Sequence, residues 1–461
     1  MTLTRRVAAV ALVGLLMAGP GPFTPHADAG GPPDATPSAT APPTEAAEEA
    51  EEACTPLAPR EQAAQLVMSG IPGTAANEDS LSLVASDAGS VIVMPPNVDD
   101  LEQVVALLED LRAAAPAGLL TAVDEEGGRV ARLAGLGDVP ALPPARDLAQ
   151  AGPPTQAGVS GRALGAGLAA IGIDLNLAPV LDVTDAPDGS VIGDRAFAAD
   201  ARRVARYGRA FADGLRAGGV AAAGKHFPGH GRTDVDSHES LPAIDASMDA
   251  LAASDLHPFR AALPSLDAVM TAHVVIDALD AERPASLSPA VHELLRDEWG
   301  FDGLIITDAL EMGAITDTLS IPEAAEGAIA AGADLALVAG AWQHTEAVTD
   351  RLVDAIDSGR IPERRWQASV RRVLRAKGVE PTEATCLLGL PAVGDADVVG
   401  TDEGVATVVG GRLRRLPDGW RLQRPGLYDP AELERLEPAS PIACLAGGCG
   451  RGARLTGLLG H

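Results

Sequence analysis

Aromatic and basic residues are both scarce in this sequence. Phe, Trp and Tyr make up 3% of its 461 positions, although 46% are hydrophobic, so the core must be built from Ala, Val and Leu. Lys and Arg number 35 against 64 Asp and Glu, which gives a formal net charge of −29. Nucleic acids and anionic membranes are recognised by basic surfaces. We therefore expect no nucleic-acid partner, and a neutral or modestly charged ligand fits better.

Long apolar runs are also missing. The longest, "VAAVALVGLLMAG", is too short to span a bilayer comfortably, follows the basic "MTLTRR" and precedes a small-residue Ala-x-Ala pattern ending at Ala29. This predicts a signal peptide over residues 1–29, with an uncleaved membrane anchor as the alternative. We expect a secreted protein, with association to the cell envelope possible, and no stable membrane insertion after cleavage. Residues 30–53 are rich in Pro, Ala, Thr and then Glu, and predict a disordered stalk.

From about residue 57, short apolar runs alternate with helical patterns. Each run is nearly continuous and is bounded by Gly, Pro or Asp, as in strands that are buried on both faces. The eight runs are 65–71, 90–94, 119–123, 173–180, 220–227, 268–274, 303–309 and 333–339. Eight such strands predict an α/β fold, a (β/α)8 TIM-type barrel forming a single catalytic domain over residues 54–386. A doubly wound open sheet is the alternative, but no G-x-G-x-x-G loop follows the first run.

The helical patterns predict a helix over 97–114, with an N-cap in its opening Asn-Val-Asp-Asp, and a final helix over 362–378. Residues 387–461 lose this periodicity and predict an irregular tail with few strands. Only four cysteines are present, which allows three complete pairings. Because the ends of a closed barrel meet, our hypothesis is a disulfide between Cys54 and Cys386, which bracket the globular region.

Ionisable residues follow five of the predicted strands. In a barrel, the carboxyl ends of the strands form one rim, and catalytic residues gather there. The residues concerned are Asp124, Asp182, Lys225 with His226, His273 and Asp308. Their convergence predicts a site at this rim.

The densest stretch, "KHFPGHGRTDVDSHES" (225–240), suggests a metal site at first sight. Lys225 disfavours a nearby cation, and Pro and Gly break the helix that an H-x3-H pair would need, so we predict no metal. Asp236 and His238 are two residues apart, which in an extended segment places both side chains on one side, where the carboxylate can orient the imidazole. Gly229 and Gly231 predict a loop that can move.

Four segments, "KHFPGHG" with "DSH", "ITDALEM" (306–312), "AVDEEGGRVARL" (122–133) and "VIGDRAF" (191–197), resemble glycoside hydrolase family 3, specifically its β-N-acetylhexosaminidase branch. The resemblance covers roughly residues 57–380, and it implies a barrel enzyme that retains anomeric configuration. Two departures are Ala196, where serine is common, and Glu125, where glutamine is common. The tail is too short for the second domain of larger members, which favours the single-barrel hexosaminidases.

The resemblance also assigns roles to individual residues. Asp308 matches the nucleophile, His238 the general acid/base and Asp236 its partner. The positions that match sugar-binding residues are Asp124, Arg132, Arg195, Lys225 and His226. This implies an enzyme that removes terminal N-acetylglucosamine from peptidoglycan fragments or chitin oligosaccharides and requires no cofactor. We also expect a monomer. A phosphorylase or a β-glucosidase of the same family, and a non-catalytic sugar-binding protein, are the alternatives.

Overall fold

The computed structural model describes residues 54–390 except Asp234, together with four short strands between residues 398 and 422. The predicted signal peptide (1–29) and stalk (30–53) lie outside the described residues, as does most of the predicted tail (387–461). No helix within the described part of the chain is both long and apolar enough to cross a membrane.

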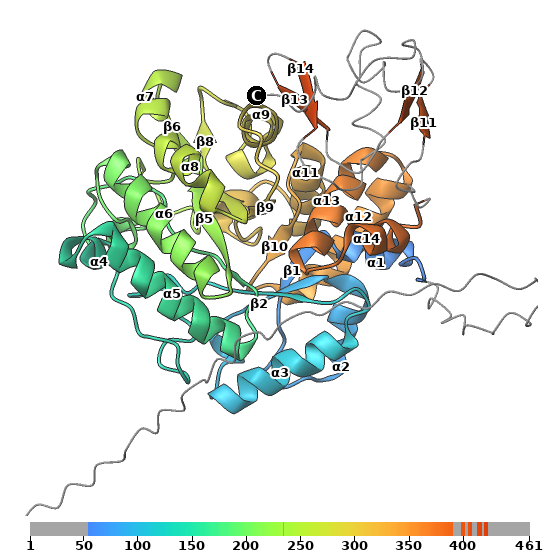
Figure 1. The fold of residues 1–461 in the computed structure, drawn as a ribbon, viewed down its shortest axis with the longest axis horizontal. Helices are drawn as coiled ribbons and strands as arrows, with labels where there is room; N and C mark the ends of the chain where they lie inside the picture. The colour runs from blue at the N-terminus through green and yellow to red at the C-terminus, as the bar shows by residue number, and fades with distance from the viewer. Residues whose placement is uncertain are drawn as a thin grey trace, which may run out of the picture. The chain divides into compact units, whose positions relative to one another are not determined.

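Eight parallel strands form the central sheet in the order β10-β1-β2-β3-β4-β5-β7-β9 (Figure 1). They are β1 Val67–Gly70, β2 Ser90–Val93, β3 Leu120–Val123, β4 Leu175–Asn176, β5 Ala221–Phe227, β7 Ala268–Thr271, β9 Leu304–Thr307 and β10 Ala336–Val338. A bridge between Ile306 and Leu335 links β9 to β10, and the Leu310 N–H donates to the Leu337 carbonyl at 2.9 Å. The sheet thus closes on itself, and the predicted (β/α)8 barrel is confirmed, with a strand in each of the eight predicted runs.

Helices follow the strands around the outside of the barrel (Figure 1). The longer ones are α3 Leu101–Ala114, α5 Pro154–Ile171, α6 Ala201–Ala217, α11 Ile321–Ala331, α12 Thr345–Asp357 and α13 Glu363–Ala376. The shorter ones are α1 Pro59–Ala64, α2 Glu78–Ser82, α4 Ala145–Ala151, α7 Met248–Ala253, α8 Leu256–Ala262, α9 Pro289–Glu293, α10 Gly313–Thr316 and α14 Pro381–Leu387. Two π-helical turns, Leu83–Asp87 and Leu294–Glu298, extend α2 and α9. As predicted from the Asn-Val-Asp-Asp sequence, α3 has a side-chain N-cap, because Asp100 Oδ1 accepts from the Gln103 N–H at 2.9 Å.

Two apolar layers explain why the strand runs are continuous rather than alternating. On β2, Ile92 points into the barrel interior with Met68 and Leu120, whereas Val91 and Val93 pack outward against the helices. Both faces of the strand are therefore buried, as in other all-parallel sheets. The interior is filled largely by Leu, Ile, Met and Ala, which is why the protein needs so few aromatic residues.

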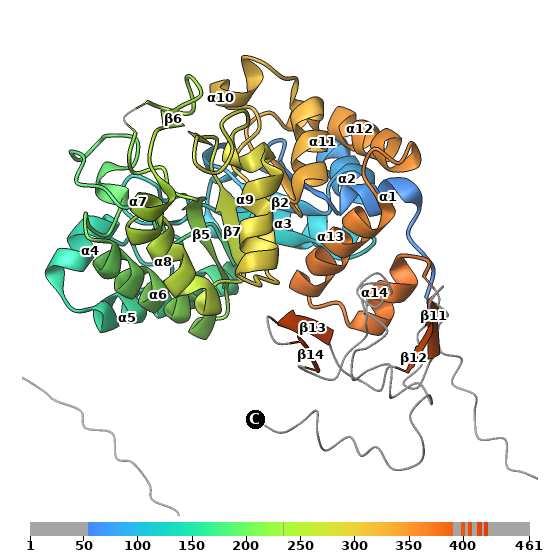
Figure 2. The ribbon, with the colours of Figure 1, turned by 90° about the horizontal axis from the view of Figure 1, so that it is seen from above.

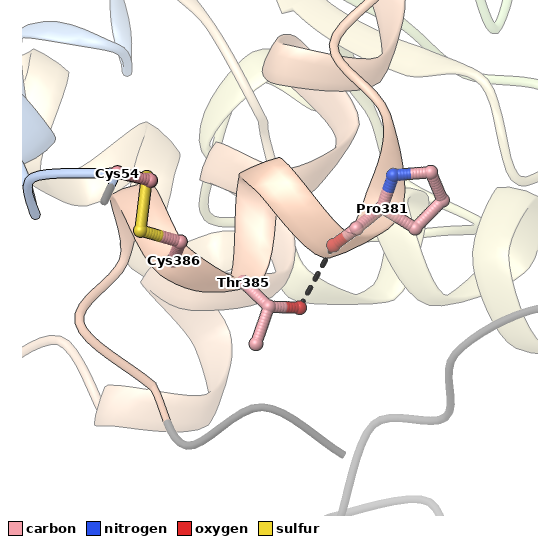
Figure 3. The surroundings of a disulfide bond; sticks show 4 residues. All are labelled: Cys54, Pro381, Thr385 and Cys386. Carbon is pink, nitrogen blue, oxygen red and sulfur yellow. Dashed lines mark hydrogen bonds between the residues drawn. A yellow bond between two sulfur atoms is a disulfide. The ribbon is translucent and has the colours of Figure 1, made fainter. Parts of the chain in front are cut away.

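The two ends of the barrel chain are joined (Figure 3). Cys54 and Cys386 form a disulfide with a Cα–Cα distance of 6.2 Å, which is the pairing hypothesised from the sequence. Beside it, the Leu57 N–H donates to the Leu387 carbonyl at 2.9 Å, and Thr385 Oγ1 donates to the Pro381 carbonyl at 2.8 Å.

The prediction that 362–378 is the final helix was wrong. That segment is α13, but Pro381 begins the further helix α14, which carries Cys386. Proline is well tolerated at a first helical position, because its missing N–H has no partner within the helix. In the region predicted to be irregular, β11 Val398–Thr401 pairs antiparallel with β12 Gly404–Thr407, and β13 Leu413–Leu416 with β14 Gly419–Leu422.

The two ends of the barrel carry different elements. Figure 2 shows α10 and the small strand β6 (Ala243–Ile244) on one side of the barrel and α14 on the other. The first side is the one to which the carboxyl ends of the strands point, since β6 follows β5 and α10 follows β9. β6 pairs there with β8 (Val275–Ile276).

Candidate active site

A buried lysine lies at the centre of the site. Lys225, near the end of β5, has a side chain only 3% exposed, and its Nζ lies 2.5 Å from Asp124 Oδ1 and 2.7 Å from Glu126 Oε1. Both carboxylates follow β3, the strand that is two places along the sheet from β5. Burial acts to lower the pKa of Lys225, but the two carboxylates outweigh it and raise the pKa. The lysine is therefore a fixed cation.

Glu126 also holds Arg195. Arg195 Nε and Nη2 each donate to one oxygen of the Glu126 carboxylate at 2.8 Å, which is a bidentate pair. The Glu126 side chain is 4% exposed, and burial alone would raise its pKa, but Arg195 and Lys225 lower the pKa strongly. One carboxylate thus fixes two cations from different parts of the chain and gives each a defined position at the barrel rim.

His226 is oriented by two neighbours. Its Nδ1 lies 2.7 Å from Asp182 Oδ2, and its Nε2 lies 3.3 Å from Arg195 Nη2. Arginine can only donate, so Nε2 accepts and Nδ1 carries the proton that is donated to Asp182. The Asp182 side chain is fully buried, and its Oδ1 also accepts from the His230 N–H at 2.7 Å. Burial alone would raise the pKa of Asp182, but the contacts with His226 and His230 lower it.

Asp308 follows β9 and lies in the same electrostatic environment. Its N–H donates to the Thr271 carbonyl at 2.9 Å, and its Oδ1 accepts from the Ala309 N–H at 2.8 Å. Burial acts to raise the pKa of this carboxyl, but the imidazoles of His226 and His273, together with Lys225, hold the pKa below its usual range. Asp308 is therefore an anion on a fixed strand end, as a nucleophile must be.

His273 supports the segment that carries Asp308. His273 Nε2 lies 2.9 Å from the Ala309 carbonyl, which can only accept, so Nε2 donates and Nδ1 accepts from Ser286 Oγ at 2.7 Å. Burial acts to lower the pKa of His273.

Asp236 and His238 lie on an exposed loop after β5. His238 Nδ1 lies 2.8 Å from Asp236 Oδ1, which also accepts from the His238 backbone N–H at 2.9 Å. The His238 side chain is 70% exposed, and the Asp236 side chain 39%. Burial acts to raise the pKa of Asp236, but together the bonds from the His238 backbone and ring outweigh it and lower the pKa. The carboxylate accepts from Nδ1, so Nε2 is left to exchange a proton.

The expected extended segment is instead a turn. The side chains meet because one carboxylate oxygen binds both the ring and the backbone of the residue two positions later, as Asx turns do. The two glycines of the loop, Gly229 and Gly231, lie close to neighbouring atoms. A Cβ on Gly229 would lie 2.8 Å from Asp255 Cβ, and one on Gly231 would lie 2.2 Å from the Val183 carbonyl oxygen. Both glycines are required for close packing in this arrangement, and the mobility of the loop stays a prediction.

A pocket of about 540 Å³ brings the loop and the rim together. Its lining residues are Arg129, Val130, Pro187, Gly189, Ser190, Val191, Arg195, Asp236 and His238. The size falls within the usual range for small-molecule sites, roughly 300–1,000 Å³. The acid/base candidate and Arg195, one of the two cations that Glu126 holds, thus line the same pocket.

Arg132 belongs to a loop that is held by Glu125, the residue found where glutamine is common in the family. The buried Glu125 Oε2 accepts from the backbone N–H groups of Arg132 and Leu133 at 2.6 and 2.7 Å, and burial raises the pKa of this carboxyl. Glu125 thus shapes the loop that carries Arg132. Arg132 Nε is buried with no hydrogen-bond partner among the described residues, so this guanidinium retains a donor for a ligand.

The structure thus joins Asp124, Lys225, Arg195 and His226 in one bonded network, whereas Asp236 and His238 bond to each other on a separate loop. Asp308 and Arg132 border the network without a hydrogen bond to it. Sequence reasoning assigned no role to Glu126, although the paired carboxylates of "DEEGG" next to a predicted strand end were visible. Among the described residues, no three His, Cys, Asp or Glu side chains are grouped so that they could hold a metal ion.

Known proteins resemble this chain in sequence. The model of the Glycosyl hydrolase family 3 N terminal domain matches residues 59–376. The Beta-hexosaminidase LpqI of Mycobacterium tuberculosis (strain ATCC 25618 / H37Rv) is 39% identical over 337 residues, which cover 70% of this chain and 84% of that protein. A Beta-hexosaminidase of Idiomarina loihiensis is 37% identical over 289 residues, covering 61% and 87%.

Solved structures are similar as well. A glycoside hydrolase family 3 beta-N-acetylglucosaminidase from Paenibacillus sp. str. FPU-7 superposes with a TM-score of 0.67 at 38% identity, over 75% of this chain and 66% of that one. A family member from Mycobacterium smegmatis str. MC2 155 superposes with a TM-score of 0.65 at 38% identity, over 70% and 98%. On its fold, its site and these similarities, the chain belongs to glycoside hydrolase family 3.

Proposed function

We propose that this protein is a retaining exo-β-N-acetylhexosaminidase that releases terminal N-acetylglucosamine by double displacement. The proposal rests on two groups at the same rim. One is the ionised Asp308 on a fixed strand end, and the other is the His238 imidazole, which is bonded to Asp236 on a loop. The names of the similar proteins, beta-hexosaminidase and beta-N-acetylglucosaminidase, support the substrate class.

In the first step, an Asp308 oxygen attacks the anomeric carbon. The bond from that carbon to the glycosidic oxygen breaks, and the leaving oxygen takes the proton from Nε2 of the His238 imidazolium. Asp236, bonded to Nδ1, stabilises the imidazolium before the proton is transferred. The products of this step are a glycosyl ester on Asp308, the leaving alcohol and a neutral His238.

In the second step, water attacks the anomeric carbon. The neutral Nε2 of His238 takes one proton from the water, and the ester bond to Asp308 breaks. The sugar leaves with its original configuration, and both side chains return to their starting states. No other proton acceptor is needed.

The buried network supplies the sugar-binding groups. Lys225 and Arg195 donate to hydroxyl groups, and Asp124 accepts from them, while Glu126 holds both cations in place. Arg132 donates through its guanidinium, which has a buried donor without a partner in the described residues. His226, held by Asp182, presents one ring orientation to the ligand.

Kinetics with aryl N-acetyl-β-glucosaminides and aryl β-glucosides test the proposal. The N-acetylated substrate should be turned over faster, and Asp308→Ala should abolish turnover of all substrates. Faster turnover of the glucoside would point to a β-glucosidase. Strong acceleration by phosphate, with a sugar 1-phosphate as product, would point to a phosphorylase, because an imidazole repels incoming phosphate less than a carboxylate would.

We also propose that the enzyme is exported and acts on peptidoglycan fragments or chitin oligosaccharides. The signal-peptide pattern at residues 1–29 supports export, and so does a disulfide, since such bonds persist mainly in oxidising compartments. Product analysis with both oligosaccharides would separate the substrates. Recovery of the protein from a reducing cytoplasm with residues 1–29 intact would contradict export.

A further inference from the structure

The hydrogen bonds of the exposed His238 ring do not by themselves fix its position relative to Asp308. Its ring is bonded to Asp236, a residue of the same turn, and it projects from a largely exposed loop. A contact within the turn fixes the shape of the turn but not its distance from β9. The elements that hold the backbone of the turn must therefore decide where Nε2 lies relative to Asp308.

Two backbone hydrogen bonds hold the turn against α10. The Gly313 N–H donates to the His238 carbonyl and the Ala314 N–H donates to the Ser237 carbonyl, each at 3.1 Å. A third anchor is the Ser237 side chain, whose Oγ lies 3.1 Å from the buried His230 Nε2. The residue that carries the acid/base candidate is thus bonded directly to the first residue of α10.

The segment from Asp308 to α10 is itself fixed to the barrel. The Asp308 N–H bonds to β7 and the Leu310 N–H to β10, each at 2.9 Å. The Glu311 carboxylate accepts from the backbone N–H of Ala339 at 3.2 Å and from that of Gly340. Gly313 therefore has a set position relative to the nucleophile five residues before it.

The close approach of the turn requires glycine at position 313. A Cβ there would lie 2.8 Å from the carbonyl oxygens of both His238 and Glu239, which is too close for a carbon atom. Both oxygens belong to the backbone, so a side-chain rotation could not relieve the contact. Any larger residue must push away the backbone that carries His238.

We propose that Gly313 is a positioning residue, which sets the distance between the nucleophile Asp308 and the acid/base His238 by allowing the turn to dock on α10. The inference rests on the proposed roles of those two residues. Retention requires the nucleophile and the acid/base to reach the two sides of the same glycosidic bond, so their separation is a catalytic variable. Displacement of a catalytic group by about 1 Å can cost roughly 100-fold in rate.

Gly313→Ala tests the inference on a series of aryl N-acetyl-β-glucosaminides. An activated dinitrophenyl group leaves without protonation, whereas a phenyl group needs the acid. We expect kcat/KM to fall about 10- to 100-fold for the phenyl substrate and by less than about 3-fold for the dinitrophenyl substrate. Gly327→Ala on α11 is the matched control, because a Cβ there would meet only Leu287 Cδ2 at 3.9 Å. It should behave like the parent with both substrates.

An equal loss on both substrates, or no loss, would overturn the inference, because a general structural defect does not depend on the leaving group. His238→Ala separates the two proposals. If that variant shows no leaving-group dependence, the proposed role of His238 fails. If it does and Gly313→Ala does not, only the positioning role fails. If Gly313→Ala does not fold, Ser237→Ala is the deciding variant. We expect its kcat/KM to fall about 3- to 10-fold for the phenyl substrate only. An equal fall for both substrates, or no fall, would refute the docking.

Discussion

Glu126 offers a sharp test of the buried network. Glu126→Gln removes the negative charge but nearly keeps the side-chain volume. Lys225 and Arg195 then stay buried without the carboxylate charge that offsets their desolvation. The Glu126 carboxylate is 4% exposed and makes contacts of 2.7 and 2.8 Å to the two cations. Removing one partner of a buried ion pair typically costs about 3–5 kcal/mol, because the remaining charge stays buried.

This cost can be converted into a melting temperature. Unfolding entropy is about 2.1 cal/mol/K per residue, so a barrel of roughly 340 residues has about 0.7 kcal/mol/K. A loss of about 4 kcal/mol should then lower Tm by about 6 °C. Glu109→Gln, at an exposed position on α3, is the matched control and should change stability by less than about 0.5 kcal/mol.

The pH dependence gives an independent check. Arg195 and Lys225 lower the pKa of folded Glu126 below the ordinary value of 4.5, even though burial acts to raise it. A carboxyl with a lowered folded pKa contributes stability above its unfolded pKa and loses it as the pH falls. The Tm difference between parent and Glu126→Gln should thus be constant from about pH 6 to 8 and shrink below about pH 4.5. A Tm within about 2 °C of the parent at pH 7 would show that the two cations are not desolvated as described.

Three further predictions concern other parts of the site and the barrel. Glu125→Gln should raise Tm at pH 7, because burial raises the pKa of Glu125 and its ionised form costs stability above pH 4.5. The gain in Tm should vanish at pH 4. A gain that persists at pH 4 would contradict this cause. Cys54→Ser should destabilise the protein by about 2–4 kcal/mol in thermal unfolding, and reductant should lower the Tm of the parent but not that of the variant. Asp182→Asn should lower kcat/KM by about 10- to 100-fold, because an amide can hold His226 in the other tautomer, and parent-like kinetics would exclude this orienting role.

The strands and the site residues were predictable to different degrees. A strand buried on both faces must be apolar throughout, and "SVIV" or "LIIT" has few other stable places in a globular domain. The position of Asp308 and Lys225 near the ends of such runs therefore placed them at one rim. The final helix α14 was missed because its seven residues carry little periodic signal and follow directly after α13.

Glu126 illustrates why the remainder of the site was not predictable. Two adjacent carboxylates follow β3. Nothing in their order indicates that Glu125 binds backbone N–H groups seven and eight residues ahead, whereas Glu126 binds Arg195. The partner lies 69 positions away in sequence and is brought near by the closure of the barrel. The contact between His230 and Ser237 was unpredictable for the same reason, because it depends on how the loop folds back on β5.

The joined ends of the barrel have a topological consequence. Because residues 54 and 386 are 6.2 Å apart, the chain between them is almost a ring, and a short peptide could replace the disulfide as its closure. The turn at Ser358 and Gly359 is exposed, and a Cβ on Gly359 would meet no atom within 4 Å. Opening the ring there would move the termini to the link between α12 and α13 and leave every strand-to-strand contact in place. The barrel is thus a candidate for circular permutation, in which the order of the strands along the gene, but not around the sheet, would change.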